Sequence, residues 1–270
     1  MTLIHQETQS DMDLLPLSTK LWIYTNYDCN LQCSYCVAGS HPKAPKRAIQ
    51  LTTVTRIIEE ALDLGFESIY FTGGEPFILG EIFKMLAYSS DKLTTTILTN
   101  GMLFRGRRLD HLTEIKNKRL ILQVSLDGSR PEHQDPYRGR GSWQKTVDGI
   151  KILLKLDFRV RISTTETSTN TKFMEEICDF RRSLGISDED HIIRPLAKRG
   201  FSDEGVEVGK HNLIPEMTIN DQGVYWHPLS TDPDLLVRTE IFPLADAYSQ
   251  IKMEFAAISG SRDSGMEEFH

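Results

Sequence analysis

The segment Ser68–Pro76, with the sequence SIYFTGGEP, begins as a strand and ends as a loop. Its first four residues are mostly apolar and aromatic, which is typical of a β-strand. Gly73, Gly74 and Pro76 then interrupt this pattern, because glycine and proline mark turns. We therefore expect a strand over 68–71 that leads into a glycine-rich loop at its carboxyl end.

Strand and helix patterns alternate on both sides of this segment. Further strands are expected at about 21–27, 95–99, 120–126, 159–165 and 191–196. Helices are expected from Leu51 to Gly65 and at about 81–90, 107–116, 143–154 and 173–184. This alternation, repeated about six times, predicts an α/β fold with a parallel sheet: a partial (β/α)6 TIM-like barrel. In such barrels the chemistry lies at the carboxyl ends of the strands.

The alternation stops after Leu196. Two short strands are expected at 213–219 and 224–227 around a turn, followed by an amphipathic helix at 244–258. The barrel therefore carries a short C-terminal extension made of a β-hairpin and a helix. The chain divides into an N-terminal extension (1–18), the barrel (19–200), the C-terminal extension (201–258) and a flexible tail (259–270).

Composition excludes several classes of protein. The 270 residues carry a net charge of −7 and no long basic block, so we expect no binding to nucleic acid. No run of about 18 apolar residues is present, so no membrane span is expected. The first residues lack the charged and apolar regions of a secretory signal, and we expect a cytoplasmic protein.

Three of the four cysteines, Cys29, Cys33 and Cys36, lie in the loop expected after the first strand. A tight group of this kind in a cytosolic protein indicates a metal site rather than disulfides. Three thiolates can hold a [4Fe–4S] cluster and leave one iron open for another ligand. His41 would complete a Cys₃His zinc site instead, and spacing alone leaves both open. The fourth cysteine, Cys178, falls within an expected helix, where a small apolar role is expected.

The cysteine loop follows the first expected strand, and Gly73-Gly74-Glu75-Pro76 follows the second. Both loops should therefore lie at the same end of the barrel. Two glycines allow a ligand to approach the backbone closely, and their carbonyls and Glu75 offer acceptors to an ammonium group. This combination favours a cluster with an open iron over structural zinc.

From about Leu21 to Leu196 the sequence resembles the radical S-adenosylmethionine (SAM) superfamily, in its cysteine motif, in Tyr35 and in the GGEP loop. The resemblance implies that SAM chelates the open iron. It also implies that Gly73, Gly74 and Glu75 bind the SAM amino group, and that Tyr35 lies near the adenine.

Three further motifs resemble the branch of molybdenum-cofactor cyclases and SPASM-type peptide-modifying enzymes. They are Thr99-Asn-Gly101, Ser125-Leu-Asp-Gly128 and Tyr137-Arg-Gly139. The resemblance implies that Ser125 and Asp127 lie near the ribose and carboxylate of SAM.

Three more residues at expected strand ends are candidates to bind SAM: Asn100, Thr164 and Arg194. Thr164 and Arg194 could instead reach the substrate. Thr164 is also compatible with an ordinary strand position, and Arg194 with a structural ion pair.

The extension departs from that branch. Its members carry additional cysteines near the C-terminus for auxiliary clusters, and this sequence has none after Cys178. Met217–His227 nevertheless resembles their hairpin, with His227 roughly where a cluster cysteine would stand. We interpret the segment as a degenerate SPASM-like extension in which His227 is structural or faces the substrate.

The resemblance implies an enzyme that cleaves SAM reductively at one [4Fe–4S] cluster, with a reductant such as flavodoxin or ferredoxin. The 5′-deoxyadenosyl radical then abstracts hydrogen from the substrate. The lost auxiliary cluster favours a small organic metabolite as that substrate. The alternatives are modification of a ribosomal peptide by dehydrogenation, crosslinking or epimerisation, and, in another class, a non-catalytic zinc-binding scaffold.

Overall fold

The computed structural model describes residues 17–259. Almost all of the expected N-terminal extension and of the C-terminal tail lies outside these residues. No helix within 17–259 is long and apolar enough to cross a bilayer.

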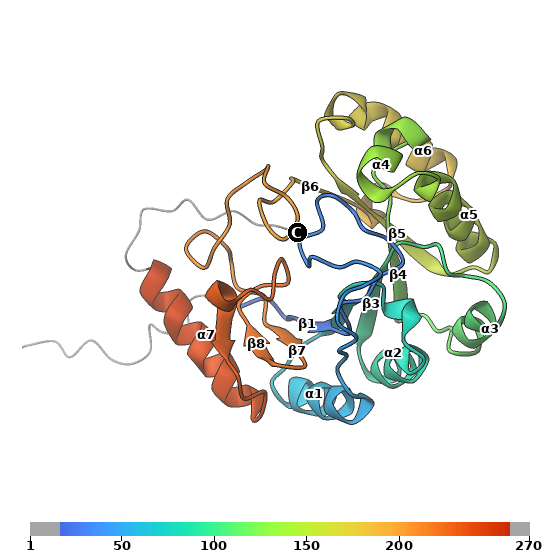
Figure 1. Cartoon of the computed structure of the whole chain (residues 1–270). Helices are drawn as coiled ribbons and strands as arrows, with labels where there is room; N and C mark the ends of the chain where they lie inside the picture. Colours follow the sequence, from blue (N-terminus) through green and yellow to red (C-terminus); the bar gives the residue numbers. More distant parts are fainter. Residues whose placement is uncertain (1–16, 260–270) are drawn as a thin grey trace, which may run out of the picture.

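Six parallel strands form the barrel. They are β1 (Lys20–Tyr24), β2 (Ser68–Thr72), β3 (Thr94–Thr99), β4 (Leu120–Ser125), β5 (Arg159–Thr165) and β6 (His191–Arg194). They pair in chain order from β1 to β6. Figure 1 shows the helices along the outer side of this curved sheet. The expected α/β class and partial (β/α)6 TIM-like barrel are confirmed.

Five of the helices between the strands match the expected ones. They are α1 (Leu51–Asp63), α2 (Ile82–Lys92), α3 (Arg107–Glu114), α5 (Ser142–Lys155) and α6 (Met174–Ser183). The longer ones bury an apolar stripe, as α1 does with Val54, Ile57, Ile58 and Ala61. Residues 17–259 also contain four short 3₁₀ helices: η2 (Pro76–Ile78), η3 (Thr171–Phe173), η4 (Asp188–Asp190) and η5 (Pro233–Leu235).

The two faces of the sheet differ in chemistry, because side chains alternate along each strand. In β2, Ile69 and Phe71 are fully buried in the apolar core formed with the helices. Tyr70 and Thr72 face the barrel interior, where the Tyr70 ring lies 4.5 Å from the Trp22 ring between centroids. The barrel interior is therefore more polar and aromatic than its wall.

The short helix α4 (Pro131–Arg138) was not expected from the sequence. Pro131 stands in its first turn, where a missing N–H costs nothing, but Pro136 lies inside it and masks the helical pattern. This helix matters for the site because it carries Gln134 and Arg138.

The C-terminal extension continues the barrel sheet. The expected hairpin consists of β7 (Thr218–Asn220) and β8 (Gly223–Tyr225), and both strands are shorter than predicted. β7 pairs in parallel with β1, and β9 (Leu236–Arg238), which was not expected, pairs with β8. The result is one nine-stranded sheet. The last helix, α7 (Leu244–Ser259), begins where the backbone N–H of Leu244 donates to Glu60 Oε2 of α1, at 2.7 Å.

Candidate active site

A cavity of about 230 Å³ lies at the carboxyl ends of the barrel strands. All six barrel strands contribute to its lining through their last residues or the segments that follow them, together with residues 227–229 of the extension. Cys29, Cys33 and Cys36 all line it. The structure thus brings the three cysteines to the end of the barrel where parallel α/β folds place their chemistry.

Backbone donors and burial shape the cysteine loop. Cys29 Sγ accepts a hydrogen bond from the N–H of Leu31 at 3.4 Å, and Cys36 Sγ accepts one from the N–H of Ser40 at 3.3 Å. Burial raises the pKa of the Cys29 thiol to about 12 and that of Cys33 to about 11. Such thiols lose their protons when a metal coordinates them, so the loop suits a cationic ligand that compensates thiolate charge.

The arrangement of the thiols bears on the kind of metal site. Within residues 17–259, no three His, Cys, Asp or Glu side chains are placed to hold a single metal ion. All three thiols line one cavity, as three ligands of one cluster must. His41 does not line the cavity: its ring lies 6.1 Å from that of Phe201 between centroids, and its Nδ1 accepts from the N–H of Lys43 at 3.2 Å.

The two glycines of the GGEP loop allow it to pack on the cysteine loop. A Cβ at Gly73, where φ is +134°, would overlap the carbonyl of Asn26, and one at Gly74 would overlap that of Asp28. The N–H of Gly74 donates to Asn26 O at 2.8 Å. Glycine is therefore required here for contact between two backbones, in addition to the ligand access expected from the sequence.

Glu75 does not line the cavity. Its carboxylate is fully buried and accepts hydrogen bonds from Thr99 Oγ1 (2.9 Å) and from the backbone N–H groups of Phe77 (3.2 Å) and Asn100 (2.8 Å). Burial raises its pKa to about 7. The side chain thus braces the loop after β3, whereas the sequence suggested that it faces an ammonium group. Gly73 and Gly74 do line the cavity.

Asn100 and Ser125 lie where the sequence predicts, at the cavity. Asn100 Nδ2 donates to Asn30 Oδ1 at 2.8 Å and lies 4.0 Å from Cys29 Sγ. Ser125, the last residue of β4, lines the same cavity. Asn100 therefore connects the end of β3 to the cysteine loop.

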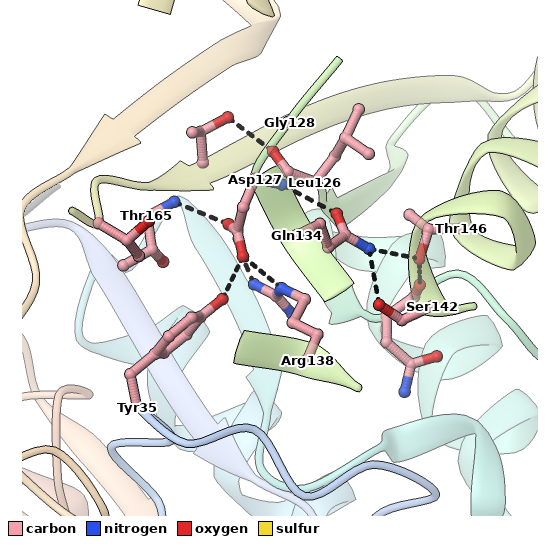
Figure 2. Close-up of polar contacts among 12 residues, drawn as sticks. Tyr35, Leu126, Asp127, Gly128, Gln134, Arg138, Ser142, Thr146 and Thr165 are labelled. Carbon is pink, nitrogen blue, oxygen red and sulfur yellow. Dashed lines mark hydrogen bonds and ion pairs between the residues drawn. The ribbon is translucent and has the colours of Figure 1, made fainter. Parts of the chain in front are cut away.

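Asp127 occupies the centre of a buried polar network (Figure 2). Its carboxylate accepts hydrogen bonds from the hydroxyl of Tyr35, from Arg138 Nε at 2.6 Å and from the N–H of Thr165 at 3.0 Å. Asp127 is fully buried and does not line the cavity, unlike Tyr35 and Arg138. The residue expected beside SAM therefore anchors two residues that reach the cavity.

Helix α4 completes this network. Gln134 Oε1 accepts from the N–H of Asp127 at 3.0 Å, and Gln134 Nε2 donates to Ser142 Oγ at 3.4 Å (Figure 2). The carbonyl of Tyr137 accepts from the N–H of Ser34 in the cysteine loop at 2.9 Å. The sequence analysis assigned no role to Arg138 or Gln134, although the Tyr137-Arg-Gly139 motif marked the region.

Thr164 points away from the cavity and Thr165 lines it. Thr164 Oγ1 donates to the carbonyl of Leu126 at 2.7 Å and also contacts His191 Nε2 at 2.9 Å. Because successive side chains of a strand face opposite sides, the expected contact moves by one residue to Thr165.

Trp22, Tyr24, Arg194 and His227 also line the cavity and are called its aromatic end here, while Cys29, Cys33, Cys36, Tyr35 and Arg138 are called its cysteine end. Arg194 is expected there from the sequence, and burial lowers its pKa. His227 Nδ1 accepts from the N–H of Leu229 at 3.1 Å, which holds the segment after β8 in place. Cys178 lies half-buried on α6 and outside the cavity.

The model of the Radical SAM superfamily matches residues 23–183, and the chain belongs to that superfamily. It is therefore a radical SAM enzyme, whose cofactors are a [4Fe–4S] cluster and S-adenosylmethionine.

Curated relatives share this domain. The chain is 28% identical over 179 residues to the AdoMet-dependent heme synthase of Methanosarcina barkeri, covering 65% of this chain and 51% of that protein. It is 29% identical over 183 residues to the antilisterial bacteriocin subtilosin biosynthesis protein AlbA of Bacillus subtilis, covering 67% and 40%. The chain thus spans about half of these proteins or less.

Solved structures share the fold. SuiB of Streptococcus suis, bound to its precursor peptide SuiA, superposes with a TM-score of 0.62 at 22% identity, over 74% of this chain and 45% of SuiB. AdoMet-bound anSMEcpe gives a TM-score of 0.65 at 16% identity, over 89% and 82%. At these identities the likeness concerns the fold alone.

Proposed function

We propose that this chain is a single-cluster radical SAM enzyme that acts on a small organic metabolite. Cys29, Cys33 and Cys36 hold the cluster. When bound, the reduced cluster and SAM supply a 5′-deoxyadenosyl radical that abstracts hydrogen from the substrate. The observation that carries the proposal is that the three thiols line one cavity together with Gly73 and Gly74.

Different groups of this chain bind different parts of SAM. The backbone carbonyls of Gly73 and Gly74 offer acceptors to the amino group of SAM, while Glu75 fixes the loop from behind. Asn100, Ser125 and Thr165 present polar side chains along the same wall, and Tyr35 adds an aromatic ring for the adenine. The site orients SAM and excludes water, while the chemistry belongs to the cofactors.

The C-terminal extension, which contains no cysteine, supports a small substrate. We assign the barrel to 19–200 and a degenerate SPASM-like extension to 201–258. The extension contains no cysteine, and its residues 227–229 line the cavity instead. A segment that would otherwise hold an auxiliary cluster thus forms part of the substrate wall, with His227 facing the cavity.

One anaerobic experiment tests this proposal. The protein is reconstituted with iron and sulfide, mixed with SAM and dithionite, and 5′-deoxyadenosine is measured by mass spectrometry. We expect iron–sulfur absorption and deoxyadenosine. A protein that binds only zinc and yields no deoxyadenosine would instead be the zinc-binding scaffold.

Modification of a ribosomal peptide is the second candidate function. It is favoured by two relatives from Bacillus subtilis, the antilisterial bacteriocin subtilosin biosynthesis protein AlbA and the sporulation killing factor maturation protein SkfB. Small peptides encoded beside the gene are incubated with the reduced enzyme and SAM and then analysed by mass spectrometry. This experiment distinguishes a peptide substrate from a small metabolite. A mass change of −2 or an unchanged mass with inverted stereochemistry on such a peptide would replace the metabolite proposal.

A further inference from the structure

Two arginines line the cavity, and within residues 17–259 no aspartate or glutamate does. Arg138 is neutralised by Asp127, with 2.6 Å between Nε and Oδ2. Arg194 has no such counterion: its side chain makes no ion pair and no hydrogen bond in the described part of the chain, and its Nε is buried without an acceptor. The cavity therefore carries one uncompensated positive charge.

Arg194 is half-buried, and only its Nε is fully buried without a partner; buried polar atoms are rarely left unpaired. The acidic group that acts most strongly on Arg194 is Glu216. Its carboxylate is already occupied, because it accepts from Trp22 Nε1 at 2.6 Å and from Lys20 Nζ at 3.2 Å. Burial lowers the pKa of Arg194 in spite of Glu216, so the protein itself does not compensate this charge.

The position of Arg194 is fixed by the sheet. It is the last residue of β6, in register with Thr165 of β5, and both residues line the cavity. Its carbonyl accepts from the N–H of Glu166 at 2.8 Å. A guanidinium held on a strand end is a more precise binding group than one on a loop.

The two arginines come from different elements, Arg138 from α4 and Arg194 from the end of β6. Arg138 acts on the cysteine loop: its charge opposes the rise in the pKa of Cys33, and its guanidinium lies 5.4 Å from the Tyr35 ring centre. Arg194 lines the cavity together with Trp22 and Tyr24 and has no counterion among residues 17–259. Because Arg138 already pairs with Asp127, and SAM is assigned to Gly73 and Gly74 in the proposed function, Arg194 remains for the substrate.

We propose that Arg194 binds a carboxylate of the substrate, which makes the substrate an organic acid. One free guanidinium matches one singly charged carboxylate through two parallel hydrogen bonds, whereas a phosphate monoester carries nearly two charges. Trp22 and Tyr24 provide apolar contact for the rest of the molecule. This inference rests on the proposed function, since it assumes that SAM occupies the cysteine end.

The test uses holoprotein that is reconstituted, saturated with SAM and kept without reductant. Fluorine NMR titrations compare 4-fluorobenzoate with the neutral 4-fluorobenzamide. A second pair, acetyl-Ala-Ala-(4-fluoro-Phe) with a free carboxylate or a C-terminal amide, represents a peptide source of the same group. We expect at least one acid to bind about ten-fold more tightly than its amide.

Three variants assign the preference to Arg194. Arg194→Gln should abolish it, and Arg194→Lys should keep part of it, because the charge remains without the planar fork. Arg140→Gln removes the same charge at an exposed position outside the cavity and should leave the preference intact. The SAM affinity of each variant is measured alongside, and melting curves confirm folding.

Each outcome decides the proposal. A preference confined to the benzoate pair supports a small acid, and one confined to the peptide pair supports a carboxylate from a peptide. No preference in wild type, or a preference that survives Arg194→Gln, overturns the carboxylate site. A ten-fold loss of SAM affinity in Arg194→Gln also overturns it, because Arg194 would then bind the carboxylate of SAM. If the reduced enzyme forms no deoxyadenosine, the proposed function is contradicted, whereas the carboxylate site at Arg194 is not.

Discussion

The cysteine end and the aromatic end of the cavity each contain an arginine, and the two differ in burial and in partners: Arg138 is buried and Arg194 is half-buried. Arg138 is fixed by Asp127 within a network that also holds Tyr35, Thr165 and α4 (Figure 2). Arg194 has no counterion. The difference indicates that the cysteine end is preorganised by the protein for cofactors that are always the same, whereas the aromatic end is completed by its ligand.

The largest effect is expected from Cys33→Ala, which removes one cluster ligand at the preorganised end. We expect complete loss of iron–sulfur absorption and of 5′-deoxyadenosine, because two thiolates cannot hold the cluster. Arg194 variants should retain SAM cleavage, so this prediction separates the two ends.

Cys178→Ala is the matched control, since Cys178 lies on α6 and outside the cavity. It should keep both the absorption and the product. A Cys33→Ala protein that still forms deoxyadenosine would contradict the assignment of the three ligands.

Asp127→Asn should destabilise the fold by about 3 kcal/mol, because removing one partner of a buried ion pair leaves Arg138 buried and uncompensated. Urea unfolding of the variant measures the loss. Adding Arg138→Met should recover part of it, since the double variant no longer buries an unpaired charge.

Glu176→Gln provides the control for this prediction. It breaks the Arg130–Glu176 pair, whose side chains are 47% and 43% exposed, and should change stability by less than about 1 kcal/mol. If Asp127→Asn lowers the free energy of unfolding no more than Glu176→Gln does, the network around Asp127 does not stabilise the cysteine end.

Sequence patterns predicted the location of the site better than the direction of its side chains. The three cysteines, Gly73 and Gly74 were placed correctly at the cavity, because their positions follow from the order of strands and loops alone. The cavity contact expected for Thr164 is made by its neighbour Thr165. Which of two successive residues faces the cavity depends on how the strand pairs with its neighbours.

Asp127 and Glu75 are expected from the sequence to contact SAM, and in the structure their carboxylates accept hydrogen bonds from the protein. Their donors come from segments distant in sequence, such as the hydroxyl of Tyr35 and the backbone of Asn100. Part of the Asp127 network also comes from α4. This helix was not expected from the sequence because Pro136 interrupts its helical pattern. A carboxylate at a strand end therefore indicates a polar site, but its partner is decided by tertiary packing.

Glu75 makes stability depend on pH. Its pKa is raised by burial from an ordinary 4.5 to about 7, so the folded state binds this proton more tightly than the unfolded chain does. The stabilisation is complete below about pH 4.5 and is lost as the pH rises through about 7, by up to about 3 kcal/mol.

Urea unfolding of wild type and Glu75→Gln between pH 5 and 8 tests this dependence. Wild type should lose stability across that range, and Glu75→Gln should lose less, because glutamine does not ionise. Equal slopes for the two proteins would show that Glu75 is charged at all these pH values, and its hydrogen bonds from Thr99 and Asn100 would then outweigh burial.

The smallest effect concerns the two neighbouring threonines of β5. Thr164→Val removes the hydrogen bond to the buried carbonyl of Leu126, so it should lower the free energy of unfolding by about 1 kcal/mol without changing SAM affinity. Thr165→Val should have less effect on stability, because only the backbone N–H of Thr165 bonds to Asp127, and valine retains it. Urea unfolding and SAM titration of both variants measure this difference. A loss of SAM affinity in Thr164→Val alone would show that Thr164, and not Thr165, faces the cavity. It would contradict the β5–β6 register that places Arg194 at the cavity.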